Sequence, residues 1–129
     1  MLYPIPPHRL PYEWETIGPV LSPAFEQDDE RDTVDLVGLI FDWRVTFWRV
    51  TGGYVVTQKV GTTLWILYAG GKGGGLRNMR DLLALIEHKA RELKCREVKF
   101  EGRDWRRIAR GYSVSHTADG RWHFRKGLV

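Results

Sequence analysis

The residues best suited to binding an anion form one glycine-rich run that contains a lysine. The run is Gly70-Gly71-Lys72-Gly73-Gly74-Gly75, and it lies between an apolar segment and a strongly amphipathic one. Backbone amides in such a turn, at the start of a helix, can hold a phosphate group, and Lys72 would add positive charge. Because the run lacks the Gly-Lys-Ser/Thr ending of a Walker loop and the dinucleotide-binding fingerprint, two interpretations stay open. Residues 71–75 either bind a phosphate or form a flexible connector.

A second candidate for anion binding is a group of four arginines near the C-terminus. Its members are Arg103, Arg106, Arg107 and Arg110, with Trp105 between them. Guanidinium groups bind phosphates in a bidentate way, so this group is a candidate interface for nucleic acid or another anion. Two other interpretations are a solvated basic face and a contact with an acidic neighbouring subunit.

Residues for metal binding or acid–base catalysis are harder to assign. The four histidines are scattered and Cys95 is the single cysteine, so the spacing typical of a zinc site is absent and we expect no metal. Cys95 is expected to be a small buried hydrophobic residue. Possible general bases are Asp42, Glu101 and His116. The sequence shows no partner for any of them, so the catalytic residues stay unknown.

The elements that would position these residues follow from the hydrophobic periodicity. A proline-rich arm, residues 1–11, is expected to be extended, and residues 12–25 to form one or two short, broken helices. A short helix over residues 33–41 is followed by three antiparallel strands, residues 44–51, 54–60 and 62–69. Residues 64–68 are apolar throughout, which predicts a central strand covered on both faces. A single domain spanning residues 1–129 is expected.

The second half of the chain is predicted to alternate helices and strands. An amphipathic helix over residues 79–93, capped by Asn78, precedes a strand over residues 96–101 that should run parallel to the previous one. Residues 103–110 read as a short basic helix. Residues 111–116 and 121–126 flank Asp119-Gly120, which predicts a β-hairpin.

Composition and charge limit the classes of function. The 129 residues carry 20 Lys+Arg and 16 Asp+Glu, with 43% hydrophobic residues, which is typical of a folded α/β domain rather than a disordered chain. Residues 1–70 hold 5 basic and 9 acidic side chains (−4), and residues 71–129 hold 15 and 7 (+8). We expect no membrane insertion and no secretion by a signal peptide. Trp14, Trp43 and Trp48 are candidate interface anchors, although most tryptophans should be core.

The order of elements and three stretches of sequence resemble the GNAT superfamily of N-acetyltransferases. The stretches are Trp65 through the glycine run, the helix end Ala90-Arg-Glu-Leu-Lys-Cys95, and the strand with Val98 and Phe100. The resemblance covers residues 12–126 and implies a GNAT-like domain with a mixed, mostly antiparallel sheet and helices on both faces. It also implies that amides of Gly71, Lys72, Gly73, Gly74 and Gly75 hold the pyrophosphate of acetyl-CoA. The arginine group could then bind the 3′-phosphate of coenzyme A.

Two positions depart from the family pattern. The leading Arg or Gln of the family's pyrophosphate loop is missing, and Arg107 stands where a tyrosine often serves as the general acid. An arginine cannot protonate a leaving thiolate at neutral pH, because its pKa lies above about 12.

A narrower resemblance is to small GNAT-like proteins encoded among the virion genes of tailed bacteriophages. It rests on residues 35–48, on Ile86-Glu-His-Lys-Ala-Arg91 and on Glu101-Gly-Arg-Asp-Trp-Arg-Arg107. The resemblance implies a catalytically degenerate virion or assembly component near the head–tail region, located in the virion or the bacterial host cytoplasm. Its partners would be other virion proteins or further copies of itself. The alternative is an active N-acetyltransferase that uses acetyl-CoA on an unknown amine, and nucleic-acid binding ranks last.

Overall fold

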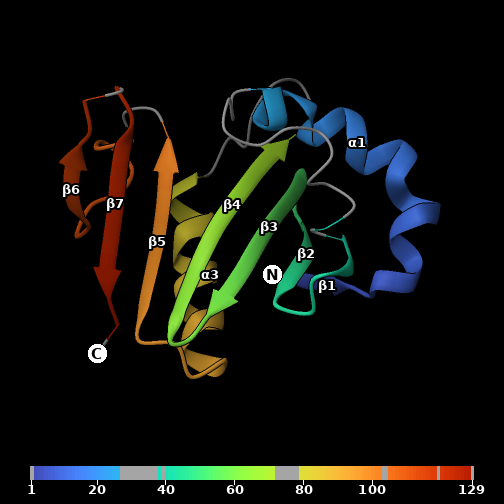
Figure 1. Ribbon diagram of the computed structural model, residues 1–129, viewed down its shortest axis with the longest axis horizontal. Coiled ribbons are helices and arrows are strands. Elements are labelled where there is room, and N and C mark those ends of the chain that lie inside the picture. The colour runs from blue at the N-terminus through green and yellow to red at the C-terminus, as the bar shows by residue number, and fades with distance from the viewer. Residues whose placement is uncertain are drawn as a thin grey trace. The chain divides into compact units, whose positions relative to one another are not determined.

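The computed structural model describes residues 2–26, 38, 40–71, 79–102, 105–118 and 120–128. Its regular elements lie in the order that follows (Figure 1). They are β1 (Tyr3–Ile5), a 3-10 helix (Pro7–Arg9), α1 (Leu10–Glu26), β2 (Val45–Val50), β3 (Gly53–Val60), β4 (Thr63–Gly71), α3 (Met79–Glu92), β5 (Glu97–Gly102), β6 (Ser113–His116) and β7 (Trp122–Gly127).

The strands form one mixed sheet, which confirms the predicted α/β class. Its order is β1-β2-β3-β4-β5-β7-β6. Strands β2 and β3 pair antiparallel, β4 and β5 pair parallel, and β7 pairs antiparallel with both β5 and β6. The parallel pair is joined through α3, as the predicted crossover requires. The β6–β7 hairpin is also confirmed, with Gly120 at φ +85°, a conformation that favours glycine.

The chain divides into two compact units. Unit 1 consists of Met1–Gln58 and Tyr68–Arg77, and unit 2 of Lys59–Leu67 and Asn78–Val129. In unit 1, α1 buries Ile17 and Leu21 completely, and β2 buries Phe47, whose ring meets the edge of Trp14. Trp48 is buried as well, and its indole N–H donates to the Thr57 hydroxyl at 2.8 Å.

In unit 2, α3 packs on one face of the sheet. Its apolar stripe buries Leu82, Leu83, Ile86 and Ala90, as the periodicity predicts. The strands supply Val98, Phe100 and Phe124, and the last two rings stack with their centroids 4.7 Å apart. Cys95 is buried at the end of the helix, which confirms its expected role as a small core residue. Burial raises the pKa of its thiol.

The N-terminal region differs from prediction. Residues 10–26 form one continuous helix instead of short broken ones, although Pro19 removes a backbone donor in its interior. The burial of Ile17 and Leu21, one helical turn apart, offsets that loss. The proline-rich arm is extended only over β1, which pairs with β2, and then turns into the 3-10 helix.

Two later predictions were also wrong. Residues 105–110 form turns instead of a helix. The Ile108 and Ala109 amides both donate to the Trp105 carbonyl, and the next bond, from the Tyr112 amide to the Ala109 carbonyl, forms a separate turn. Strand β4 is central in the sheet, as predicted, but it is not covered on both faces, since Trp65, Ile66 and Leu67 are only half-buried. The predicted helix over residues 33–41 lies mainly outside the described residues, and the predicted Asn78 cap lies wholly outside them.

Candidate functional site

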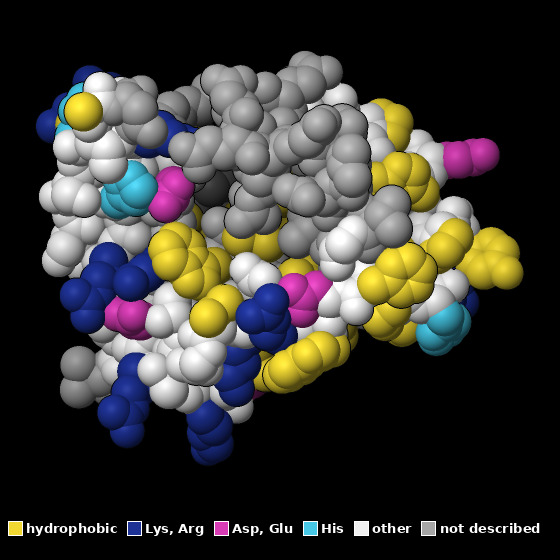
Figure 2. Space-filling model, in the orientation of Figure 1, with side chains coloured by type: hydrophobic (Ala, Val, Ile, Leu, Met, Phe, Trp, Pro, Cys, Tyr) yellow, Lys and Arg dark blue, Asp and Glu magenta, His cyan; other side chains and the backbone are white. Residues whose placement is uncertain are grey.

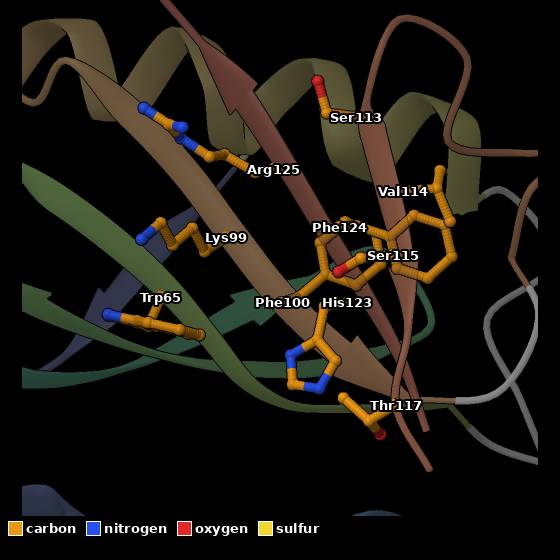
Figure 3. Close-up of a pocket in the computed structure, with 10 residues that line it drawn as sticks. All are labelled: Trp65, Lys99, Phe100, Ser113, Val114, Ser115, Thr117, His123, Phe124 and Arg125. Carbon is orange, nitrogen blue, oxygen red and sulfur yellow. The ribbon is translucent and has the colours of Figure 1, made fainter. Parts of the chain in front are cut away.

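A pocket of about 390 Å³ lies on the sheet in unit 2. Figure 3 shows side chains from β4, β5 and β7 projecting into the same region, together with the hydroxyl groups of the β6 edge. Its lining residues are Trp65, Lys99, Phe100, Ser113, Val114, Ser115, Thr117, His123, Phe124 and Arg125. This volume falls in the range of small-molecule sites.

The register shows that the pocket opens on the face of the sheet opposite α3. Lys126 on β7 reaches Glu87 of α3 at 2.6 Å, so its strand neighbour Arg125 points to the other face. Ser113 lies opposite Arg125, and Lys99 lies between Arg125 and Trp65. Figure 2 shows Lys and Arg side chains beside acidic and hydrophobic ones over this part of the sheet.

Glu97 orients the two cationic side chains at one end of the pocket, Lys99 and Arg125. Its carboxylate accepts hydrogen bonds from the Thr63 hydroxyl at 2.7 Å and from Arg125 Nε at 2.6 Å, and it lies 3.5 Å from Lys99 Nζ. These bonds, first that of Thr63 and then that of Arg125, lower the pKa of Glu97 to about 2. Glu97 is therefore ionised at neutral pH and orients both cations.

At the other end of the pocket, a histidine and a carboxylate form a pair. His123 Nδ1 lies 3.1 Å from Glu101 Oε1, and both side chains are about one-third exposed, at 34% and 35%. If Nδ1 carries the proton that this contact requires, Nε2 is left as an acceptor. The pair lies just beyond the last β4–β5 pairing, between Ile66 and Phe100. The sequence suggested Glu101 as a base but did not reveal its partner.

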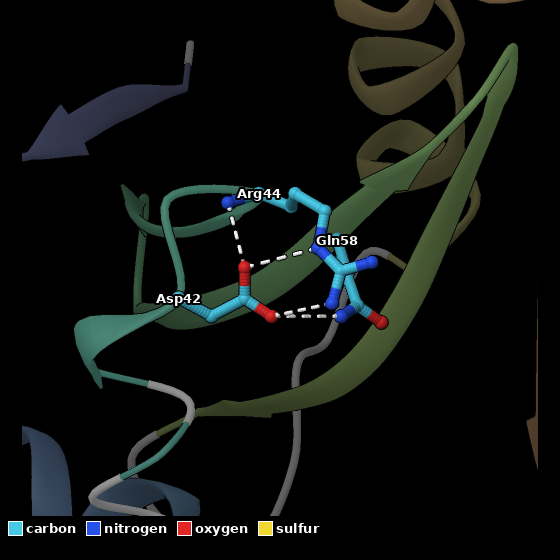
Figure 4. Close-up of polar contacts among 3 residues, drawn as sticks. All are labelled: Asp42, Arg44 and Gln58. Atoms are coloured by element: carbon cyan, nitrogen blue, oxygen red, sulfur yellow. Dashed lines mark hydrogen bonds and ion pairs between the residues drawn. The ribbon is translucent and has the colours of Figure 1, made fainter.

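The other proposed bases are engaged differently. Asp42 accepts bonds from the Arg44 side chain and amide and from Gln58, and these lower its pKa to about 2 (Figure 4). It is therefore a weak base at neutral pH. His116 packs on the Trp122 ring with centroids 4.4 Å apart.

The predicted anion-binding residues lie only partly in the described chain. Gly71 ends β4 and is buried, whereas Lys72, Gly73, Gly74 and Gly75 lie outside the described residues, as does Arg103. Arg106, Arg107 and Arg110 are exposed. The Arg106 guanidinium lies 4.3 Å from the centroid of the Trp122 ring. In place of the predicted basic helix, a turn therefore holds one arginine against an aromatic ring.

Trp43 in unit 1 is the most exposed large hydrophobic residue of the described chain, at 90%. It occupies a turn in which the Val45 amide donates to the Asp42 carbonyl at 3.0 Å. The Arg44 side chain closes on the Asp42 carboxylate through two hydrogen bonds, at 3.1 and 2.9 Å, and Gln58 of β3 holds the same group at 3.2 Å (Figure 4). The turn thus presents an apolar ring from a fixed backbone. Of the other candidate anchors, Trp48 is buried and Trp14 is half-buried.

Glu87 is a buried carboxylate outside the pocket. It is 8% exposed and receives hydrogen bonds from Lys126 at 2.6 Å and from the Tyr112 hydroxyl at 3.2 Å. Burial, with the adjacent Glu87 charge, raises the pKa of Tyr112 well above its usual value. The phenol is therefore a hydrogen-bond donor at neutral pH. We assign this network to the packing of α3 on β7.

Comparison with solved structures defines the fold class as that of the GNAT acetyltransferases. The chain superposes over 100% of its length on 97% of an aminoglycoside 6′-acetyltransferase type Ii, with TM-score 0.71 and 10% identity. It matches the ribosomal-protein-S18-alanine N-acetyltransferase of Escherichia coli over 99% of this chain and 93% of that one, with TM-score 0.64 and 11% identity. A Bacillus subtilis acetyltransferase in complex with CoA matches over 89% and 93%, with TM-score 0.62 and 14% identity.

At these identities the similarity establishes the fold. No protein-family model matches the sequence, and no curated protein matches it either. Within the described residues, no group of His, Cys, Asp and Glu side chains is placed to hold a metal ion, and no helix is long and apolar enough to cross a membrane.

Proposed function

We propose that this GNAT-fold chain works through protein contact, as a catalytically degenerate virion-associated or assembly component of the tailed-bacteriophage type. The observation that carries the proposal is Trp43, a 90% exposed ring on a turn fixed by Asp42 and Arg44. A rigid exposed tryptophan is the kind of residue that dominates binding interfaces, because it buries a large area with little loss of conformational freedom. Phe41, which is 82% exposed, lies two residues away and extends the apolar surface.

The sequence resemblance and the charge distribution support the same role. The segment 35–48, which contains Trp43, is one of those that resemble virion proteins of tailed phages. The halves of −4 and +8 favour association through charge as well, either with other virion proteins near the head–tail region or with a second copy. Arg107 at the position of the family's tyrosine supports loss of catalysis.

The experiment that tests this role is mass spectrometry of density-gradient-purified phage particles from a culture that carries the gene. We expect the chain to sediment with the particles at a constant ratio to the major capsid protein and to remain after a high-salt wash. Recovery of the chain only in the soluble fraction of the host would overturn the proposal.

A second candidate function, acetyl-CoA-dependent N-acetyl transfer, is supported by the His123–Glu101 pair beside the pocket. His123 Nε2 would accept the proton of the acceptor ammonium while Glu101 holds Nδ1–H. The free amine would then attack the thioester carbonyl, the C–S bond would break, and the second amine proton would pass to the departing thiolate. The resemblance assigns the pyrophosphate to amides of residues 71–75, of which Gly71 is described and ends β4.

Calorimetric titration with acetyl-CoA at low salt separates the two functions. Acetyl transfer requires binding tighter than about 100 μM, or about −5.5 kcal/mol. It further requires that His123→Gln keep that binding and lose at least about 100-fold in transfer rate. The protein-contact role predicts no detectable heat from a folded sample. A size measurement on the same sample reports self-association.

A further inference from the structure

We propose that the pocket on the open face of unit 2 binds a small organic molecule carrying an anionic group at one end and a protonated amine at the other. Lys99 and Arg125 are the permanently charged side chains among the ten lining residues, and none of the ten is a carboxylate. Neither proposed function specifies a ligand for this pocket. If the chain transfers acetyl groups, the amine of this ligand is the acceptor.

The anionic end is assigned to Arg125, Lys99 and Ser113. Arg125 uses Nε to donate to Glu97 at 2.6 Å, and the two Nη groups of its fork remain available as donors for a carboxylate or phosphate. Lys99 is held near the same carboxylate at 3.5 Å and also lies 5.4 Å from the Trp65 ring centroid. Ser113, exposed and directly opposite Arg125 in the register, adds a hydroxyl donor.

The amine end is assigned to His123 and Ser115. His123 lies two residues from Arg125 on the same face of β7, which separates the two positions by about 6.7 Å. Its Nδ1 faces Glu101, so Nε2 accepts a hydrogen bond from an ammonium group, and Ser115 opposite His123 offers a second acceptor. The Trp65 ring, opposite Lys99 in the register, adds an apolar wall beside the anionic end.

The test is a direct binding measurement without acetyl-CoA, by protein-observed NMR titration of the full chain. The probe is 5-aminopentanoate, whose extended length is close to the separation of the two ends. Pentanoate and pentylamine each lack one charged end, and glycine carries both ends too close together. We expect each of these three to bind at least tenfold more weakly, with shifts from 5-aminopentanoate centred on β6 and β7. Equal binding of all four, or shifts elsewhere, would overturn the proposal.

Variants assign the two ends. Arg125→Gln should weaken 5-aminopentanoate at least tenfold and leave pentylamine unchanged, while His123→Phe should weaken pentylamine and leave pentanoate unchanged. Arg91→Gln, an exposed arginine on α3, is the matched control and should change nothing. If Arg125→Gln fails to fold, Lys99→Met probes the same end. A further titration with 4-aminobutyl phosphate identifies the anionic group of the ligand. Tighter binding than that of 5-aminopentanoate indicates a phosphate, and weaker binding indicates a carboxylate. Unchanged affinity in Arg125→Gln or Lys99→Met would contradict the assignment.

Discussion

Replacing Trp43 by alanine is expected to reduce incorporation of the chain into particles about 30-fold, with no change in the unfolding midpoint. The ring is 90% exposed in the free chain, so its removal leaves the fold intact. At an interface it would bury most of its surface, and loss of such an anchor typically costs about 2 kcal/mol or more, equivalent to about 30-fold in affinity. The measurement is the variant-to-wild-type ratio in particles from cells that express both forms with different tags.

Two further variants make this expectation specific. Tyr12→Ala removes another aromatic ring, 84% exposed on α1 but not held in a hydrogen-bonded turn, and should incorporate like wild type. Asp42→Asn keeps Trp43 but weakens the bonds to Arg44, so a severalfold loss is expected because the ring is less pre-organised. If Trp43→Ala and Tyr12→Ala incorporate equally, Trp43 is not the anchor and the protein-contact proposal loses its principal support.

Local patterns predicted most of the sheet and the helix α3. Strands β2 and β3 alternate with clear turn residues between them, and α3 has a sustained apolar stripe, so both follow from contacts close in sequence. The predicted helix at residues 105–110 was wrong because Trp105 and Ile108 lie three residues apart, a spacing that fits a single turn as well as a helix. A helix of six residues does not offset its nucleation cost. The continuous helix α1 was not predicted because its prolines indicate a helix break locally, whereas the burial of Ile17 that stabilises the helix depends on tertiary contacts.

The candidate pocket depends on contacts that a single sequence does not contain. The Asp119-Gly120 pair predicts that β6 and β7 are neighbours, but not that β7, rather than β6, lies beside β5. That placement sets Glu101 opposite His123 and Lys99 opposite Arg125. The exposure of Trp43 has a similar origin, because Gln58 on the next strand helps to hold its turn. Trp43 and Trp48 are both candidate anchors in the sequence, yet the first is exposed and the second is buried.

Replacing Glu87 by alanine is expected to destabilise the chain by about 2–3 kcal/mol. The substitution removes the carboxylate that pairs with Lys126 at 2.6 Å and accepts the Tyr112 hydroxyl at 3.2 Å. Lys126 is partly exposed, so water compensates some of its loss, but Tyr112 is buried and its hydroxyl would be left without this acceptor. Urea unfolding monitored by circular dichroism measures the change in free energy.

The control for this loss lies on the same helix. Glu92 also carries an ion pair, to Lys89, but its side chain is 48% exposed, so Glu92→Ala should leave the unfolding midpoint unchanged. Glu87→Gln keeps an acceptor for Tyr112 and should be milder than Glu87→Ala. Combined with Lys126→Met, Glu87→Gln should cost less than the sum of the two single changes, because each single variant already breaks the pair. Additive effects, or equal losses for Glu87→Ala and Glu92→Ala, would show that this network does not hold α3 against β7.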